Sequence, residues 1–412
     1  MRTAITLTIA CTAVLLAACA GTPNSERSTE SPFAIETPAD PSWPLRMVHY
    51  RTTSGAIYLG NLDARIEELQ RIVAERGMAV HRTALAGSLY HRYRVVGRFK
   101  DAEEALRLLD AAVATEPAVA EHRQMRAVVR SGFHRFTEAL EDLDAAAAAG
   151  APEETLRKTR REIRLALGDY APLREDFAHS TELAADFDEL AHRADLRLQQ
   201  GDPIGANFLY RAAQTQFRDV NPVPLAWLHV QQGIAHLRYG NVLEARRFFA
   251  AAHERLPQYT LATEHLAECE TSLGNLDAAR ALYREVIAQT ANPEFVAALA
   301  GLERAAGNTA EADRLTQDAE RGYTDLLKRN PAAFAQHAAE FYIDIGKPER
   351  ADALARENLQ LRQDVGSWIL LAQTAQAIGD EARACDARAH AVETALRPPE
   401  LSDLDALASR CR

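Results

Sequence analysis

Glycine and small apolar residues recur along this chain at fixed spacings, and the pattern predicts paired helices. Nine glycines follow one another at intervals of about 35 residues: Gly97, Gly132, Gly168, Gly201, Gly240, Gly274, Gly307, Gly346 and Gly379. A small residue stands seven positions before six of them, and an alanine stands five positions after seven of them. A unit of this length is too short to bury a core alone, so neighbouring units must stack. The pattern therefore predicts an array of helical hairpins, each turning at a glycine.

Two stretches carry the motif of the tetratricopeptide repeat, a helix-turn-helix unit of about 34 residues. The first is formed by Gly233, Gly240, Ala245, Phe249, Ala252 and Pro257, and the second by Trp368, Leu371, Ala372, Gly379, Ala384 and Ala391. Residues 83–397 thus resemble the tetratricopeptide family. The resemblance implies an all-α fold, a right-handed α-solenoid of about nine helical hairpins whose first helices line a concave groove.

The first three units depart from this motif. Tyr90 and Arg161 stand where a small residue belongs, and the second unit has a longer turn, because Ala139 follows Gly132 by seven positions in place of five. The two longest glycine intervals, which end at Gly240 and Gly346, predict longer second helices or longer loops between hairpins. An alanine-rich helical bundle and a solenoid of Sel1-like repeats are the alternatives. The regular glycine spacing favours the tetratricopeptide array.

Residues 46–82 are predicted to form an N-terminal extension and a first helix. Asn61 can cap this helix, because a side-chain amide oxygen accepts hydrogen bonds from free backbone N–H groups at a helix start. One apolar stripe follows at helical spacing, formed by Leu62, Ile66, Leu69 and Val73.

The N-terminus has the layout of a bacterial lipoprotein signal. A basic start is followed by an apolar run from Ala4 to Leu16, which is shorter than a membrane-spanning helix requires, and then by Leu16-Ala17-Ala18-Cys19. This sequence resembles the lipoprotein processing site, which implies a signal peptide over residues 1–18 and a lipidated Cys19 that anchors the protein in a membrane.

The residue after the predicted lipidated cysteine bears on localisation. Ala20 is not the aspartate that retains many such lipoproteins at the inner membrane, so the resemblance implies the outer membrane, with the chain facing the periplasm. Residues 19–45 are rich in Pro, Ser and Thr and are predicted to form a flexible linker.

Charge and composition exclude several functions. The formal net charge of −11 argues against nonspecific binding of nucleic acid. No zinc-protease, nucleophile-elbow or phosphate-loop motif occurs, and His229 and His236 have no carboxylate or cysteine at ligand spacing. We therefore predict no catalytic residues, no cofactor and no metal site, and a chain that is not an enzyme.

Cysteine spacing predicts a disulfide near the C-terminus. Pro398 ends the last repeat helix, and residues 398–412 are predicted to fold back as a capping helix. Cys385 and Cys411 lie at equal distances before and after Pro398, so an antiparallel hairpin would place the two thiols at the same height. Two unpaired thiols are the alternative. Cys269 has no evident partner and is predicted to be buried.

The predicted groove has an acidic and polar C-terminal half. Its positions, counted back from each turn glycine, are occupied by Glu264, Glu268, Glu294, Gln336, Glu340 and Gln373. A neutral or basic extended segment is the protein partner that such a surface would attract. Alternatively, these side chains serve only to keep the surface soluble.

Two functional hypotheses follow. The first is a lipid-anchored periplasmic scaffold or assembly factor that binds a protein partner in the groove. The alternative is an accessory or regulatory subunit of an envelope enzyme of cell-wall or polysaccharide metabolism. Neither the partner nor the oligomeric state follows from the sequence.

Overall fold

The computed structural model describes residues 51–178 and 186–411, and nearly all of them are helical. The helices are α2 (Gly55–Arg76), α3 (Ala79–Val96), α4 (Phe99–Thr115), α5 (Ala120–Gly132), α6 (Phe136–Ala148), α7 (Glu153–Leu167), α8 (Tyr170–Ala178), α9 (Phe187–Gln199), α10 (Pro203–Gln216), α11 (Pro222–Arg238), α12 (Val242–Arg255), α13 (Thr260–Ser272), α14 (Leu276–Thr290), α15 (Pro293–Ala305), α16 (Thr309–Arg329), α17 (Pro331–Asp344), α18 (Pro348–Leu361), α19 (Val365–Ala377), α20 (Glu381–Glu393), the 3₁₀ helix η2 (Pro399–Leu404) and α21 (Asp405–Ala408). None of the helices in this part of the chain combines the length and the apolar character that a membrane crossing needs. The predicted signal peptide, Cys19 and linker lie outside the described residues.

Nine helical hairpins run from α3–α4 to α19–α20 within the described ranges, as the glycine spacing predicts. Eight of the nine turn glycines have a positive φ, the left-handed conformation that a residue without Cβ adopts at least cost. The exception is Gly132, which is still helical; His134, two residues later, has a φ of 56° and makes the turn instead. This shift is the longer second turn that the sequence indicates.

The bulky residues of the first units are accommodated by specific neighbours. A Cβ on Gly132 would lie 2.1 Å from the hydroxyl of Tyr90, so this glycine is the hole into which the tyrosine of the preceding hairpin fits. Buried Arg161 pairs with Asp176 and lies over the ring of Phe177 at 4.8 Å. In the N-terminal hairpins, each bulky residue that departs from the motif is therefore matched by a neighbouring residue that makes room for it or pairs with it.

The two longest glycine intervals have different structural causes. Between Gly201 and Gly240, the loop before α11 is extended and α11 itself has 17 residues. Between Gly307 and Gly346, α16 is extended to 21 residues. The first described helix, α2, begins at Gly55 with Ser54 as its N-cap, so the predicted start at Asn61 is wrong.

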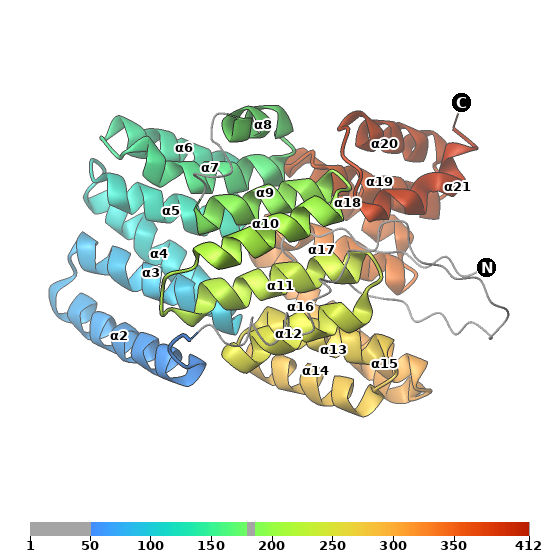
Figure 1. Ribbon diagram of the computed structural model, residues 1–412, viewed down its shortest axis with the longest axis horizontal. Coiled ribbons are helices and arrows are strands. Elements are labelled where there is room, and N and C mark those ends of the chain that lie inside the picture. Colours follow the sequence, from blue (N-terminus) through green and yellow to red (C-terminus); the bar gives the residue numbers. More distant parts are fainter. Residues whose placement is uncertain (1–50, 179–185, 412) are drawn as a thin grey trace.

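The array winds into a superhelix whose successive turns touch one another. In Figure 1 the chain rises through α3–α7, passes over α8, descends along α9–α12 and returns behind them through α16–α17. Hydrogen bonds and ion pairs join residues that are between 162 and 198 positions apart. Two backbone bonds, Gln363 N to Leu167 O at 3.1 Å and Arg397 N to Gln199 O at 2.8 Å, connect one turn directly to the next.

Side chains from both superhelical turns share one core. The largest cluster joins residues of α2–α5 to residues of α11–α13, and the ring of Phe99 meets that of Phe334 at 5.0 Å. At the end of the array, Glu400 of η2 pairs with Arg238 of α11 through two bonds of 2.6 and 2.7 Å. The superhelix is therefore closed, in the sense that its successive turns pack directly against each other.

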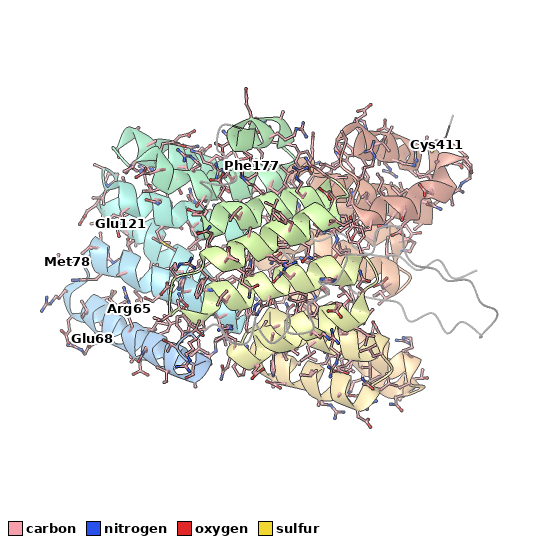
Figure 2. The ribbon with its side chains drawn as sticks, viewed as in Figure 1. Arg65, Glu68, Met78, Glu121, Phe177 and Cys411 are labelled. Atoms are coloured by element: carbon pink, nitrogen blue, oxygen red, sulfur yellow. A yellow bond between two sulfur atoms is a disulfide. The ribbon has the colours of Figure 1, made fainter. Side chains whose placement is uncertain are left out.

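The C-terminal segment folds back onto the last hairpin. It is not the single helix predicted for residues 398–412, because η2 is a 3₁₀ helix and α21 has only four residues. Cys385 of α20 and Cys411 are joined by a disulfide, with Cα atoms 5.3 Å apart, at the C-terminal end of the array (Figure 2). Cys269 is free and buried in α13.

Candidate functional site

The predicted groove residues lie on the inner helices of the last four hairpins. Their positions are Glu264 and Glu268 on α13, Glu294 on α15, Gln336 and Glu340 on α17, and Gln373 on α19. The first five are only 2–8 % exposed, and Gln373 is half-buried. The sequence predicted an open surface here. That part of the prediction is wrong, because five of the six side chains are buried.

A buried triad of side chains occupies one turn of α13. Nδ1 of His265 lies 3.1 Å from Glu264 Oε2 and 3.1 Å from Glu268 Oε2. The ring of Phe249 stacks on the imidazole at 4.9 Å and fixes its plane. All three polar side chains are 2 % exposed or less.

A second group on α15 and α17 continues the first. Nδ1 of His337 lies 3.7 Å from Glu294 Oε1 and 3.5 Å from Glu340 Oε2, and Gln336 donates to Glu340 Oε1 at 3.0 Å. We define the inner cluster as the six ionisable side chains of both groups: Glu264, His265, Glu268, Glu294, His337 and Glu340.

Burial dominates the electrostatics of the inner cluster. It raises the pKa of Glu264 and of Glu268 well above the usual range of a carboxyl group, and the neighbouring carboxylate of Glu294 adds to the shift at both positions. The pKa of Glu294 is raised for the same reason, with Glu340 contributing. Burial alone would lower the pKa of His337, yet the charges of Glu294 and Glu340 hold it above its ordinary value.

Sequence reasoning missed both histidines of the inner cluster, although a signal was present. His265 and His337 each stand nine positions before a turn glycine, in the matching five-residue segments Glu264–Glu268 and Gln336–Glu340. Each segment places an acid or amide, a histidine and a glutamate on adjacent positions of one helix face. The recurrence of this short pattern within the repeat could have revealed the cluster.

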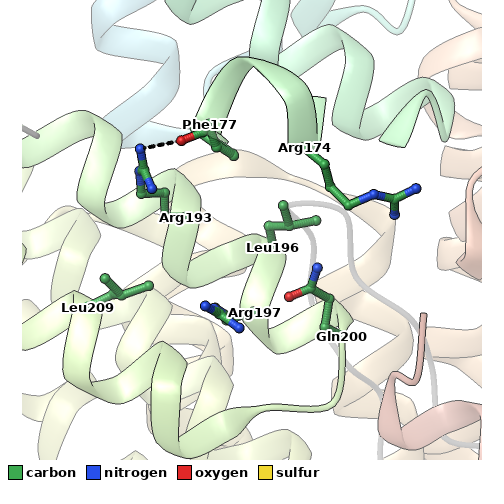
Figure 3. Close-up of a pocket in the computed structure, with 7 residues that line it drawn as sticks. All are labelled: Arg174, Phe177, Arg193, Leu196, Arg197, Gln200 and Leu209. Atoms are coloured by element: carbon green, nitrogen blue, oxygen red, sulfur yellow. Dashed lines mark hydrogen bonds between the residues drawn. The ribbon is translucent and has the colours of Figure 1, made fainter. Parts of the chain in front are cut away.

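A separate pocket of about 250 Å³ lies between α8, α9 and α10 (Figure 3). Its apolar lining consists of Phe177, Leu196 and Leu209, all buried. Its polar lining consists of Arg174, Arg193, Arg197 and Gln200. We refer to this feature as the arginine pocket.

The three arginines of the pocket are held to different degrees. Arg193 donates to the carbonyl of Phe177 at 2.8 Å and pairs with Glu189 at 2.7 Å. Arg197 is exposed and has only a loose contact of 3.8 Å with Asp202, and Arg174 is also exposed. Two guanidinium groups therefore remain available at the rim of an apolar floor.

Exposed apolar side chains adjoin the arginine pocket. Phe208, next in sequence to Leu209, is 66 % exposed, and Ile204 lies one helical turn before it on the same face of α10. Leu243 of α12 occupies the position equivalent to Ile204 in the next hairpin and is exposed as well. α10 and α12 therefore carry uncovered apolar side chains in addition to the pocket.

Comparisons with known proteins agree with the repeat architecture. The family model described as tetratricopeptide repeat matches residues 236–302, so this part of the chain consists of tetratricopeptide repeats. No curated protein sequence matches the chain.

Several solved structures are similar in fold at low identity. A tetratricopeptide-repeat protein of Thermus thermophilus is 21 % identical, covers 45 % of this chain and 97 % of its own, and has a TM-score of 0.37. The tetratricopeptide domain of P58(IPK) is 14 % identical over 90 % of this chain and 98 % of its own, with a TM-score of 0.31. Yeast Tom70 is 13 % identical over 89 % of this chain and 90 % of its own, with a TM-score of 0.32.

Proposed function

We propose that this protein is a lipid-anchored scaffold that binds a protein partner at the arginine pocket. Tetratricopeptide repeats, present over residues 236–302, are typical of protein–protein interaction scaffolds. The observation that carries the choice of surface is the burial of the inner helices. Because five of the six predicted groove residues are buried, they offer a partner little surface, which favours a site elsewhere.

The chemistry of the arginine pocket specifies the kind of partner. Arg174 and Arg197 place two positive charges beside an apolar floor in a chain whose net charge is −11. A peptide segment that combines a carboxylate with a large apolar side chain would satisfy both, since guanidinium groups bind carboxylates in paired geometry. The proposed partner segment is therefore acidic and apolar, in place of the neutral or basic segment that the sequence predicted.

The cellular location belongs to the same proposal. The lipoprotein-like sequence ending at Cys19 would anchor the chain at the periplasmic face of the outer membrane. The disulfide between Cys385 and Cys411 supports an oxidising compartment, where such bonds persist. Labelling with a palmitate analogue tests the anchor: the natural chain should incorporate label, and a Cys19→Ser variant should not. Recovery of the labelled chain in the inner-membrane fraction would contradict the proposed sorting.

A displayed library of random peptides tests the binding site. We expect peptides selected on the purified protein to be enriched in Asp or Glu next to an aromatic or aliphatic residue. An R174E/R197E variant should weaken their binding at least about tenfold, as is common when charges at an interface are reversed. The matched control R71E/R107E reverses two exposed arginines outside the pocket and should bind normally. Binding that is equally strong to both variants would refute this site.

Crosslinking in intact cells then separates the two functional hypotheses. Proteins crosslinked to the natural chain and to R71E/R107E, but not to R174E/R197E, are the partners of the pocket. Assembly components among them would support a scaffold, and a hydrolase or polymerase would support the role of an accessory subunit. Each candidate has to bind the purified chain directly, with the same dependence on Arg174 and Arg197.

A further inference from the structure

The inner cluster carries more negative charge than its neighbours neutralise. It contains four carboxylates and two imidazoles, and no Lys or Arg of the described residues forms an ion pair with any of these carboxylates. Even with both histidines protonated, two negative charges would remain unbalanced in a buried site. Such a site must take up protons or a cation, because an uncompensated buried charge is strongly unfavourable.

Several ligand atoms in the triad have no hydrogen-bond partner. Glu264 Oε2, Glu268 Oε1 and His265 Nε2 are buried and make no hydrogen bond. Buried polar atoms are rarely left in this condition, so their number in one turn of α13 calls for an explanation. A bound cation would compensate Glu268 Oε1, and also Glu264 Oε2, whose close contact is the 3.1 Å approach of His265 Nδ1.

The geometry of the triad matches a metal site. The ligand atoms of Glu264, His265 and Glu268 lie within 4.8 Å of one another, and both carboxylates approach the imidazole nitrogen at 3.1 Å. In a tetrahedral zinc site with bonds of about 2.0 Å, the ligands are about 3.3 Å apart. Small movements of three side chains would therefore create the site.

We propose that Glu264, His265 and Glu268 bind a divalent transition-metal ion inside the superhelix. Mixed imidazole and carboxylate donors suit zinc, whereas calcium and magnesium favour sites made of oxygen alone. The ion would supply the two missing positive charges. This site is separate from the arginine pocket, so its test does not depend on the proposed partner.

Metal loading of the refolded chain tests the proposal. The protein is unfolded in denaturant that contains a chelator and is then refolded with Zn²⁺, with Mg²⁺ or without metal. Bound metal is counted by mass spectrometry after dialysis. We expect one Zn²⁺ per chain, no retained Mg²⁺ and a higher Tm with zinc. X-ray absorption spectroscopy at the zinc edge should show nitrogen and oxygen ligands and no sulfur ligand. A sulfur ligand is readily distinguished because its bond to zinc is longer. That result would exclude the neighbouring Cys269 as a ligand.

Two variants make the outcome decisive. E264Q/E268Q keeps the shape of the triad and removes both charges, so it should fold without metal and bind Zn²⁺ at least about a hundredfold more weakly, since two of the three protein ligands are lost. The control D386N/E393Q removes two surface carboxylates of α20, including the partner of exposed His390, and should retain the zinc. A natural chain that refolds without binding zinc, or an E264Q/E268Q variant that binds it as tightly, would overturn the proposal.

Discussion

Closure of the superhelix predicts that two turn glycines with the same conformation respond differently to substitution. Gly168 and Gly240 have φ values of 81° and 78°. A Cβ on Gly240 would meet nothing within 4 Å, whereas a Cβ on Gly168 would lie 2.5 Å from the carbonyl oxygen of Gln363 in the next superhelical turn. Alanine at either position adopts an unfavourable left-handed conformation, at a cost of about 1–2 kcal/mol. Only the Gly168→Ala substitution also forces two turns apart.

The additional cost follows from the contact. Ordinary packing requires about 3.4 Å, so the backbone at Gln363 must move by about 1 Å, which strains the packing by about 1–3 kcal/mol. The hydrogen bond from Gln363 N to Leu167 O would be lost as well, at about 1 kcal/mol. We therefore expect Gly168→Ala to lower the free energy of unfolding by about 3–6 kcal/mol and Gly240→Ala by about 1–2 kcal/mol.

Urea unfolding and amide hydrogen exchange measure this difference. The amide of Gln363 should lose protection in Gly168→Ala and keep it in Gly240→Ala, because only the first substitution disrupts the contact between turns. Equal losses of stability, together with unchanged protection at Gln363, would show that the turns do not touch as described.

Three further predictions test other parts of the fold. Glu400→Ala leaves buried Arg238 without its partner and should destabilise the protein by about 3–5 kcal/mol in urea unfolding. The double variant R238M/E400L, which replaces the ion pair with two apolar side chains, should recover most of this loss. A cost of Glu400→Ala below about 1 kcal/mol would mean that the ion pair is exposed to solvent. Burial lowers the pKa of His229 to about 3, so its contribution to stability is present above pH 6.5 and is lost as the pH falls from 6.5 towards 3. A His229→Met variant should therefore gain about 2 kcal/mol relative to the natural chain between pH 7 and pH 5, and parallel pH profiles of the two proteins would contradict a buried neutral histidine. Removing the disulfide with C385S/C411S opens a loop of 26 residues and should weaken the C-terminal cap by about 3.5 kcal/mol. Amide hydrogen exchange around Leu404 and Leu407 should become faster as a result. Unchanged exchange would mean that packing alone holds the cap.

Local features of the fold were predictable from the sequence because they depend on short spacings. The turn glycines sit at helix ends, the alanines face one another inside each hairpin, and Cys385 and Cys411 are close enough in sequence for a simple hairpin to place them together. At Gly132, the one turn glycine without a positive φ, the sequence showed only that the turn is longer. Its cause, the hydroxyl of Tyr90 in the preceding hairpin, required coordinates.

Closure of the superhelix could not be predicted in this way. It depends on the small rotation between neighbouring hairpins, which accumulates over about 190 residues before Leu167 meets Gln363. No short motif encodes that sum. The sequence therefore identified the inner positions of Glu264, Glu268 and Glu294 and missed their burial. It also missed His265 and His337, whose importance follows only from that burial.

Closure and the charge of the inner cluster are energetically coupled. In an open groove the carboxylates of Glu264 and Glu268 would be hydrated, and their burial in the closed superhelix removes that water. Binding of a divalent ion would offset this desolvation only in the closed form, so the ion must stabilise closure by as much as closure strengthens its binding. The contacts between turns at Gly168 and the metal site on α13 would then both shift the same equilibrium, that between the open and the closed superhelix. The proposed partner, which would bind at the arginine pocket between α8, α9 and α10, would then recognise a surface whose shape depends on the same equilibrium.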